Sequence, residues 1–435
     1  MSGTVFSLHS WPRAILHVDG DAFFTTCEEA IHPELKGKPL ITGGERGIVA
    51  CASYAAKRLG IKRGVPLHEA RALCPGLIVL PSDYETYSLF SRRMFNVIRR
   101  FTPQVEEYSI DEAFADLTGM RRAHHASYET MARKIKEEIG RDLGISVTVG
   151  LSVTKVLAKI ASKHQKPNGF TLIPGRRIPD YLRDLPVQAV WGIGPATAQY
   201  LEKMGVRTAL EFARLPEGAV LKRFTKPGRE IWRELRGESV CPVSPEEKSV
   251  YASISKTKTF APPTNDPDYL FAQLLRNVES ACIKARRYSL APRKIVLFLK
   301  KNDFSFRGEE ATLVRPSAHP LEIGGLLREI FDRIYDGKEI YRATGTVLLD
   351  LVPDRNVQYS LFESPMRAEK VRRLYRAADL LGGKFGKHTL HLGGSHLIEV
   401  LGKGRRGEAT ARDRTRLPGE TARRHLGLPI LHVKA

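Results

Sequence analysis

Residues 14–24 read Ala-Ile-Leu-His-Val-Asp-Gly-Asp-Ala-Phe-Phe, and this stretch decides how the first part of the chain is expected to fold. The short apolar run at 15–18 predicts a buried strand, and a helix is expected to begin at Phe23. Asp19 and Asp21 stand between these two elements. Carboxylates at the edge of an apolar sheet repel one another and are costly to desolvate, so a nearby cation would stabilise them. The stretch therefore predicts an acidic site where a strand ends.

Further strands and helices follow in alternation. Apolar side chains spaced three and four apart predict amphipathic helices over 84–101 and 128–143. Between them, residues 105–118 predict two strands joined by a tight turn at Asp111 and Glu112. This part of the chain is therefore expected to surround one sheet, with acids at its strand ends converging over an open cleft.

The rest of the chain divides by composition. Residues 174–242 predict helices interrupted by glycine, and a linker at 244–249 is expected to lead into a small α+β domain. After residue 353, one helix candidate at 367–381 precedes a polar, charged stretch that we expect to be mobile.

The composition favours a basic protein of the cell interior. The 435 residues carry 69 Lys and Arg against 48 Asp and Glu, a formal charge of +21. This excess favours a polyanionic partner, since each Lys or Arg set against a phosphate releases counterions; a basic proteome or a solubility feature is the alternative. With 42% hydrophobic residues the chain is not wholly disordered, and no apolar run is long enough to span a membrane. The five scattered cysteines and the absence of a secretion signal favour a reduced, cytoplasmic protein.

Three carboxylates are candidate metal ligands: Asp19, Asp111 and Glu112. Each lies at the end of an expected apolar strand. Hard oxygen ligands suit Mg²⁺, and two such ions about 4 Å apart can stabilise the attacking and leaving oxygens of a displacement at phosphorus. The main-chain carbonyl of Gly20 could be a further ligand. The alternative is that these acids cap turns or pair with surface lysines.

Basic side chains in the same region are candidate donors for a triphosphate. Lys155, Lys159 and Lys163 fall on one face of an expected helix, and Lys166 follows in a Lys-Pro-Asn-Gly turn. Such donors stabilise charge that moves onto phosphates during transfer. For Lys155 and Lys159 a solvated helix face is the favoured interpretation, whereas Lys166 is the better candidate. An expected strand over 48–52 and a short helix over 54–59 add Tyr54, Lys57 and Arg58.

Five motifs, in this order along the chain, resemble those of the Y-family translesion DNA polymerases, and most of all the DinB type. The resemblance covers roughly residues 12–352. The motifs are HVDGDAFF (17–24), SYAAKRLG (53–60), YSIDEAF (108–114), VGLSVTKVLAKIASKHQKPNG (149–169) and WGIGPATAQYL (191–201).

The resemblance implies an α+β, multidomain fold, the right-hand polymerase architecture with palm, small fingers, helical thumb and little finger. The implied domains are the palm (12–22 and 84–173), the fingers (23–83), the thumb with a helix-hairpin-helix element (174–242), a linker (243–249), the little finger (250–352), and a clamp-binding peptide with a basic C-terminal tail (353–435).

The resemblance also implies an active site. Asp19, Asp111 and Glu112 match the catalytic carboxylates that bind two Mg²⁺ ions, with the Gly20 carbonyl as a further ligand. Phe24 matches the steric gate, an aromatic ring that leaves no room for a ribose 2′-hydroxyl, although it could also be a core residue. The implied nucleotide-binding residues are Phe23 (expected to be mainly structural), Tyr54, Lys57, Arg58 and Lys166, and the implied roof over the nascent base pair is Ile48 and Ala50.

One position departs from the family pattern. The family usually has Arg where this chain has Lys57, with Arg58 next to it. Lysine is a point charge without the forked grip of a guanidinium group. We therefore expect weaker nucleotide binding, with either Lys57 or Arg58 serving.

The resemblance implies partners as well: primer-template DNA, dNTPs and a sliding clamp of the β type. Gly192 and Gly194 match a hairpin whose backbone amides bind a DNA phosphate. Gln358, Leu361 and Phe362, in the segment 358–362, match the clamp peptide; an ordinary exposed linker is the alternative.

The expected activity is template-directed DNA synthesis past damaged bases, with low fidelity, by a monomer without membrane contact. Two alternatives stay open at this point. One is a non-catalytic DNA-bound adaptor on the same scaffold, which would be expected to lack the acids. The other is a palm-type nucleotide cyclase, which would need neither the thumb hairpin nor a basic little finger.

Overall fold

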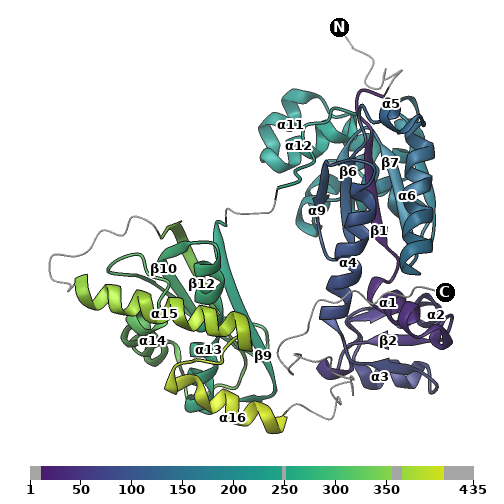
Figure 1. Cartoon of the computed structure of the whole chain (residues 1–435). Coiled ribbons are helices and arrows are strands. Elements are labelled where there is room, and N and C mark those ends of the chain that lie inside the picture. Colours follow the sequence, from purple (N-terminus) through teal and green to yellow (C-terminus); the bar gives the residue numbers. More distant parts are fainter. Residues whose placement is uncertain (1–10, 247–250, 355–364, 406–435) are drawn as a thin grey trace. The chain divides into compact units, whose positions relative to one another are not determined.

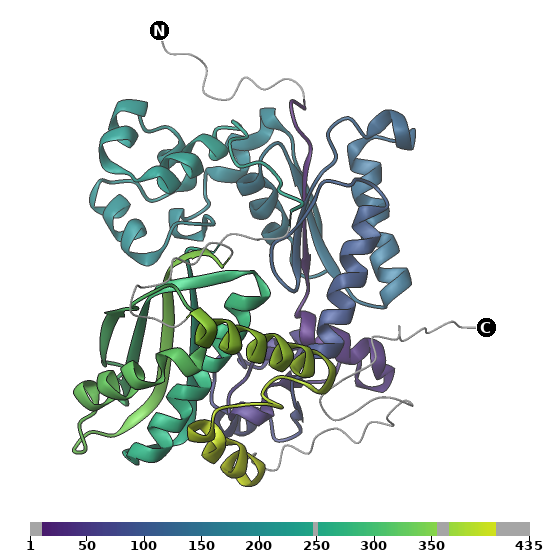
Figure 2. The ribbon, with the colours of Figure 1, turned by 60° about the vertical axis from the view of Figure 1, so that its left-hand side comes forward.

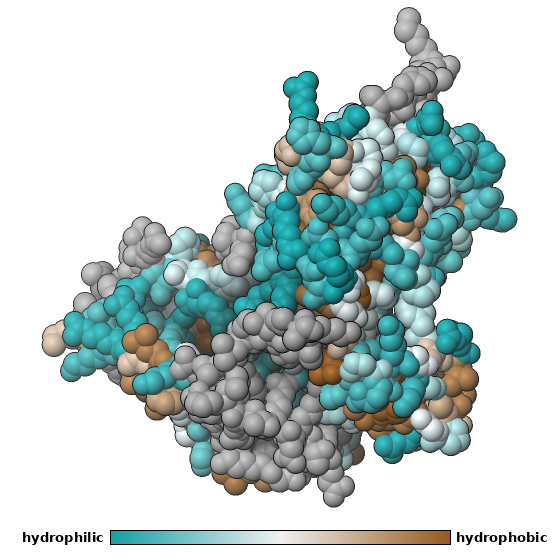
Figure 3. Space-filling model, turned by 45° about the vertical axis from the view of Figure 1, so that its right-hand side comes forward, coloured by the Kyte–Doolittle hydropathy of each residue, from teal (hydrophilic) through white to brown (hydrophobic). Residues whose placement is uncertain are grey.

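The computed structural model describes residues 11–246, 251–354 and 365–405 (Figure 1). The chain divides into two compact units, with the boundary between residues 246 and 247. This boundary lies inside the segment 243–249, where the sequence predicts a linker. On the face drawn in Figure 3, hydrophilic residues predominate and hydrophobic areas are smaller. Across the described residues, no helix is long and apolar enough to cross a membrane.

The first unit is built on a five-stranded sheet in the order β5-β6-β1-β7-β8. The central strand β1 pairs antiparallel with β6 on one side and with β7 on the other. In this register Asp19 of β1 lies directly opposite Glu112 of β6. The strands are β1 (Ile15–Gly20), β5 (Val105–Glu107), β6 (Glu112–Asp116), β7 (Val147–Ser152) and β8 (Phe170–Ile173).

Helices cover both faces of this sheet (Figures 1 and 2). The helices α4 (Tyr84–Arg99) and α6 (Tyr128–Leu143) pack against one face, where Leu16 and Val18 join their core. The helix α7 (Lys155–His164) covers the other face. Gly150 of β7 permits this approach, because a Cβ there would lie 2.2 Å from the carbonyl oxygen of Ala158.

The remainder of the first unit is a small sheet with helices and an all-helical segment. The small sheet has the order β3-β2-β4. The expected strand over 48–52 is confined to β3 (Cys51–Ala52), because Ile48 forms an isolated bridge with Pro66 instead. The other elements are α1 (Phe23–Ile31), β2 (Leu40–Thr42), α2 (Tyr54–Arg58), α3 (Leu67–Leu73), β4 (Ile78–Leu80), α5 (Arg121–His124), α8 (Ile178–Leu182), α9 (Pro195–Lys203), α10 (Ala209–Ala213), α11 (Glu217–Arg223) and α12 (Lys226–Leu235).

The second unit is a four-stranded antiparallel sheet, in the order β11-β10-β12-β9, with helices on one face. Ile295, Leu297 and Leu299 of β10 are buried in the core that the helices share with the sheet. The elements are β9 (Ser253–Thr264), α13 (Pro267–Arg287), β10 (Leu290–Lys301), β11 (Phe306–Thr312), α14 (Pro320–Ile334) and β12 (Tyr341–Pro353).

Two helices follow the sheet and pack on the second unit: α15 (Pro365–Phe385) and α16 (His396–Arg405). The polar stretch that we expect to be mobile begins at residue 402, so the structure describes only 402–405 of it, as the end of α16. The buried carboxylate of Glu279 accepts hydrogen bonds from the Leu392 amide at 2.6 Å and the Ser395 hydroxyl at 2.9 Å. Arg286 pairs with Asp379 at 2.7 Å. The expected clamp peptide at 358–362 lies outside the described residues.

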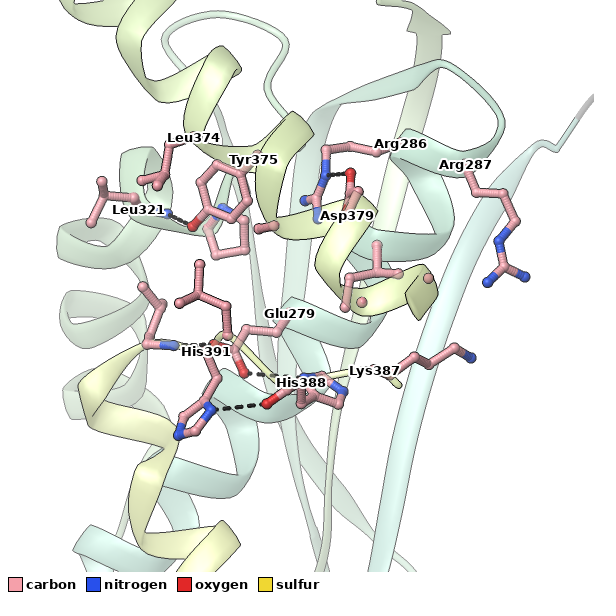
Figure 4. A pocket seen from close by; sticks show the side chains of 17 residues that line it. Glu279, Arg286, Arg287, Leu321, Leu374, Tyr375, Asp379, Lys387, His388 and His391 are labelled. Carbon is pink, nitrogen blue, oxygen red and sulfur yellow. Dashed lines mark hydrogen bonds and ion pairs between the residues drawn. The ribbon is translucent and has the colours of Figure 1, made fainter. Parts of the chain in front are cut away.

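Helix α15 and the segment 387–392 that follows it line a cavity of about 620 Å³ together with α13 and α14. Leu321, Leu374 and Tyr375 lie at one end of it, and Arg287 and Lys387 lie at the other (Figure 4). The C-terminal region is thus an integral layer of the second unit as far as the structure describes it.

Candidate active site

The acids that the sequence singles out lie at one end of the central strands. Asp19 is only 6% exposed, and its register partner is Glu112. The Gly20 amide donates a 2.8 Å hydrogen bond to the Asp111 carbonyl, which ties the β6 turn to the end of β1. The hydroxyl of Ser109 donates to the Asp111 carboxylate at 2.6 Å. Two strands and one turn therefore place all three acids at the same end of the sheet.

Two lysines neutralise this acidic group. Lys166 contacts the Asp19 carboxylate at 2.5 Å, and Lys159 contacts both oxygens of Glu112 at 3.0 and 2.9 Å. Burial raises the pKa of Asp19 to about 6; the Lys166 ammonium lowers it, and the neighbouring Glu112 carboxylate raises it. Two carboxylates so close in a buried place require positive charge beside them.

The donor set fits a divalent cation in its chemistry. Asp19, Asp111 and Glu112 supply the hard oxygen ligands that Mg²⁺ prefers. Within the described part of the chain, no group of three potential ligands is drawn together closely enough to hold a metal ion. Asp19 and Glu112 are turned to their lysines instead. A cation would therefore have to share these carboxylates with the ammonium groups or displace them.

Asp21, which the sequence places only at the end of a strand, has a structural role here. It is completely buried, and its carboxylate accepts 2.7 Å hydrogen bonds from the Thr148 hydroxyl and from the Asn168 amide. Asn168 belongs to the turn that carries Lys166, whose peptide bond to Pro167 is cis. Asp21 thus fastens the Lys166 turn to the sheet. The sequence signal for this anchor is a second acid two residues after Asp19; its burial is seen only in the structure.

Phe24 lies in an aromatic group. Its ring stacks on Tyr87 at 4.4 Å between centroids and meets Tyr84 edge-on at 5.4 Å. It is partly buried, whereas Phe23 is only 3% exposed and belongs to the core. The buried Phe23 side chain therefore cannot contact a nucleotide. Only the main chain of Phe23 is able to make such a contact.

The short helix α2 carries the other expected nucleotide-binding residues. Burial, and to a smaller extent the charges of Asp21 and Asp19, raise the pKa of Tyr54 to about 12. Lys57 and Arg58 are exposed. The Lys57 ammonium lies 4.2 Å from the centre of the Tyr54 ring, a cation–π contact that holds it beside this ring.

The expected roof residues lie on a loop that a glycine shapes. Ile48 is 42% exposed and Ala50 is partly buried. Gly43 has φ of +108°, and a Cβ there would lie 2.5 Å from the Ile48 carbonyl oxygen. The close approach of these segments therefore requires glycine, and it leaves the apolar Ile48 side chain uncovered.

The expected hairpin lies at the start of α9. Gly192 has φ of +91°, and a Cβ there would lie 2.5 Å from Ile231 of α12. Gly194 directly precedes α9, and no side chain caps this helix. Both glycines are exposed. The amides at this helix start are therefore available to an anion.

Lys155 and Lys159 are not on a solvated helix face, and that interpretation is wrong. Each is 6% exposed and paired with a glutamate of the neighbouring strands: Lys155 with Glu106 at 2.7 Å, and Lys159 with Glu112 at 2.9 Å. Their partners come from about fifty residues earlier in the chain, and helical periodicity cannot reveal such a contact.

A palm-type polymerase combines the features described above. Acids and lysines lie at the end of a central antiparallel sheet, an aromatic ring lies nearby, and an uncapped helix begins after a glycine turn. Comparisons with known proteins agree. Residues 18–163 match the impB/mucB/samB family, 251–361 match its C-terminal domain, and 176–206 match the HHH motif of the IMS family.

Individual relatives cover most of the chain. The DNA polymerase IV of Moorella thermoacetica is 34% identical over 383 residues, 87% of this chain and 95% of that protein. The DNA polymerase IV of Brucella melitensis is 34% identical over 382 residues, 87% of this chain and 85% of that protein. A solved Y-family DNA polymerase chimera of Dbh and Dpo4 has a TM-score of 0.67 and 28% identity, over 78% of this chain and 99% of that one.

The chain therefore belongs to the DinB type of the Y family of DNA polymerases. It is a translesion, DNA-directed DNA polymerase, as the five motifs predict. This excludes the non-catalytic adaptor and the nucleotide cyclase. The α+β, multidomain fold that the resemblance implies is also confirmed.

Proposed function

We propose that this polymerase extends primers past damaged bases with low fidelity, by nucleotidyl transfer from dNTPs with two Mg²⁺ ions. The primer 3′-hydroxyl attacks the α-phosphate of the nucleotide, and pyrophosphate leaves. The observation that carries the proposal is the facing pair of the buried Asp19 and the partly buried Glu112, near Asp111 and compensated by Lys159 and Lys166.

Asp19, Asp111 and Glu112 would hold the ions, together with the Gly20 carbonyl. When bound, the ions supply charge stabilisation at the attacking and leaving oxygens. The protein's own groups orient the substrates. Lys166, on its anchored turn, would bind the triphosphate and stabilise the charge that develops on the leaving pyrophosphate.

The residues around this site would select the nucleotide. Tyr54, with Lys57 or Arg58, would hold the phosphates from the fingers side. The Phe24 ring, backed by Tyr87 at 4.4 Å, would exclude a ribose 2′-hydroxyl because it cannot retreat. The roof would consist of Ile48 and Ala50, whose small contact area would constrain a distorted base weakly and so permit lesion bypass.

We assign the domains accordingly: the palm to 12–22 and 84–173, the fingers to 23–83, the thumb to 174–242, the linker to 243–249 and the little finger to 250–352. The amides around Gly192 and Gly194 would bind a DNA phosphate without reading sequence. We also assign Gln358, Leu361 and Phe362 to the binding of a β-type sliding clamp, and we expect a monomer.

The test is primer extension with Mg²⁺ on undamaged and damaged templates. We expect Asp111→Ala combined with Glu112→Ala to abolish incorporation while duplex binding persists; incorporation that survives would refute the site. Addition of a sliding clamp should increase the number of nucleotides added per binding event. That increase, and not basal incorporation, should be lost in Leu361→Ala with Phe362→Ala.

A further inference from the structure

Lys159 lies in a cage of aromatic rings. Its ammonium nitrogen is 4.4 Å from the ring centre of Tyr108, 5.3 Å from that of Trp191 and 6.0 Å from that of Phe114. The indole Nε1–H of Trp191 donates to the Tyr108 hydroxyl at 3.1 Å, which links two walls of the cage. A buried ammonium among ring faces is stabilised where it is and has little freedom to move.

The open side of this cage faces Glu112. The two carboxylate oxygens lie 3.0 and 2.9 Å from the Lys159 ammonium. A triphosphate could bind Lys159 only by displacing this carboxylate, so the lysine is poorly placed as a phosphate donor. It is well placed to fix the direction in which the Glu112 oxygens point.

We propose that Lys159 is a positioning residue for Glu112, held in place by the cage of Tyr108, Phe114 and Trp191. The proposal rests on the proposed function, in which Glu112 is a metal ligand. Groups that orient metal ligands in this way influence metal sites strongly although they never touch the ion. Trp191 comes from the segment that leads into the thumb hairpin, so the orientation of a palm carboxylate depends on a thumb residue.

The chain offers a matched control one helical turn earlier. Lys155 is buried to the same extent and contacts both oxygens of Glu106 at 2.8 and 2.7 Å. Glu106 also accepts a hydrogen bond from the Ser244 amide at 2.9 Å and has no part in the proposed chemistry. Removing either lysine leaves a glutamate without its partner, so the two variants should lose similar stability.

The kinetic test is single-nucleotide insertion by the full chain with Mg²⁺. We expect Lys159→Met to lower kcat by about 10–100-fold with the nucleotide KM unchanged, and Lys159→Arg to recover part of the loss. Lys155→Met should keep its kcat. A rise in KM at constant kcat would make Lys159 a phosphate contact and overturn the proposal. So would equal losses in Lys159→Met and Lys155→Met. Should Lys159→Met not fold, Lys159→Gln replaces it with the same expectations.

A second readout does not depend on activity. The chain has three tryptophans, so Trp11→Phe with Trp232→Phe leaves Trp191 as the fluorescent reporter of the cage. Mg²⁺ alone, without DNA or nucleotide, should change Trp191 emission, because the ion withdraws charge from the Glu112 carboxylate that the caged Lys159 ammonium contacts. The change should persist in Lys155→Met and disappear in Lys159→Met. An unaltered response in Lys159→Met overturns the proposal, whereas full activity of Glu112→Gln would refute the metal-ligand role itself.

Discussion

The carboxylate of Asp21 and the main-chain amide of Asn168 are joined by a 2.7 Å hydrogen bond between segments 147 residues apart in sequence. Asp21 is completely buried, so solvent does not reach its carboxylate. The bond fixes the turn that carries Lys166. Lys166 in turn contacts Asp19. Two aspartates near the end of one strand therefore act differently: Asp19 pairs with Lys166, and Asp21 holds the turn that carries this lysine.

Asp21→Asn should raise the nucleotide KM by about tenfold, because the amide cannot accept both hydrogen bonds and one donor is left unpaired. The free energy of unfolding should fall by about 1–3 kcal/mol. Steady-state insertion and thermal unfolding measure these effects. Thr148→Val, which removes the other bond to Asp21, should cost stability with a smaller change in KM. An unchanged KM in Asp21→Asn would contradict the anchoring role.

Lys57→Arg should lower the nucleotide KM by several-fold, because a guanidinium group can form two parallel hydrogen bonds to phosphate and lysine cannot. Lys57→Ala should raise KM. The cation–π contact holds Lys57 beside Tyr54, the other expected phosphate-binding residue of this helix, so we expect Arg58→Ala to have the smaller effect. Insertion kinetics of the three variants measure this order, and no effect at either position would remove both residues from the triphosphate site.

Phe24→Ala should admit ribonucleotides, because the cleared space accommodates a 2′-hydroxyl. The ratio of dNTP to rNTP incorporation should fall by at least tenfold, about 1.4 kcal/mol. Loss of the stacking on Tyr87 should also lower the unfolding free energy, by at most about 3 kcal/mol since the ring is only partly buried. Phe23→Leu is the control: it should affect stability alone. Unaltered sugar discrimination in Phe24→Ala would end the gate assignment.

Lys300→Ala should weaken DNA binding more than Lys294→Ala. Lys294 is engaged with Glu310 at 2.9 Å, whereas among the described contacts Lys300 has a ring contact with Phe304 and no ion pair. If Lys300 contacts a phosphate, the slope of log affinity for duplex DNA against log salt concentration should decrease in magnitude by about one in Lys300→Ala. Fluorescence anisotropy over a range of salt concentrations measures it, and equal slopes for the two variants would be the contrary result.

Glu322 should contribute to stability above about pH 4.5 and lose that contribution as the pH falls toward 2. Burial raises its pKa, but hydrogen bonds from His319 and Ser317 and the charge of Arg315 outweigh burial and lower it to about 2. The folded state therefore favours the ionised form. The difference in unfolding free energy between wild type and Glu322→Gln should be larger at pH 7 than at pH 3. A pH-independent difference would contradict the shifted pKa.

Local patterns predicted most of the framework. The helix expected over 128–143 is observed as Tyr128–Leu143, because a Ser127 cap, a regular apolar face and Gly144 all define its limits. The helix expected over 84–101 ends two residues early, at Arg99. The acids were identifiable because each follows or begins an apolar strand.

Features that depend on distant partners could not be predicted in the same way. The burial of Lys159 arises from Glu112 and from rings supplied by two segments, 108–114 and the one around Trp191. The packing of the last described helices depends on Glu279, a helical acid that a sequence reader would assign to the surface.

Gly150 is remote from any reacting atom, yet its missing side chain sets the spacing between the central sheet and the helix behind it. A methyl group there would collide with the main chain at Ala158 and Ser162, only 2.2 and 2.3 Å away. The helix would have to shift as a rigid rod, and Lys155, Lys159 and the turn beyond them would shift with it. Gly150→Ala should therefore impair DNA synthesis although it changes no residue of the proposed active site.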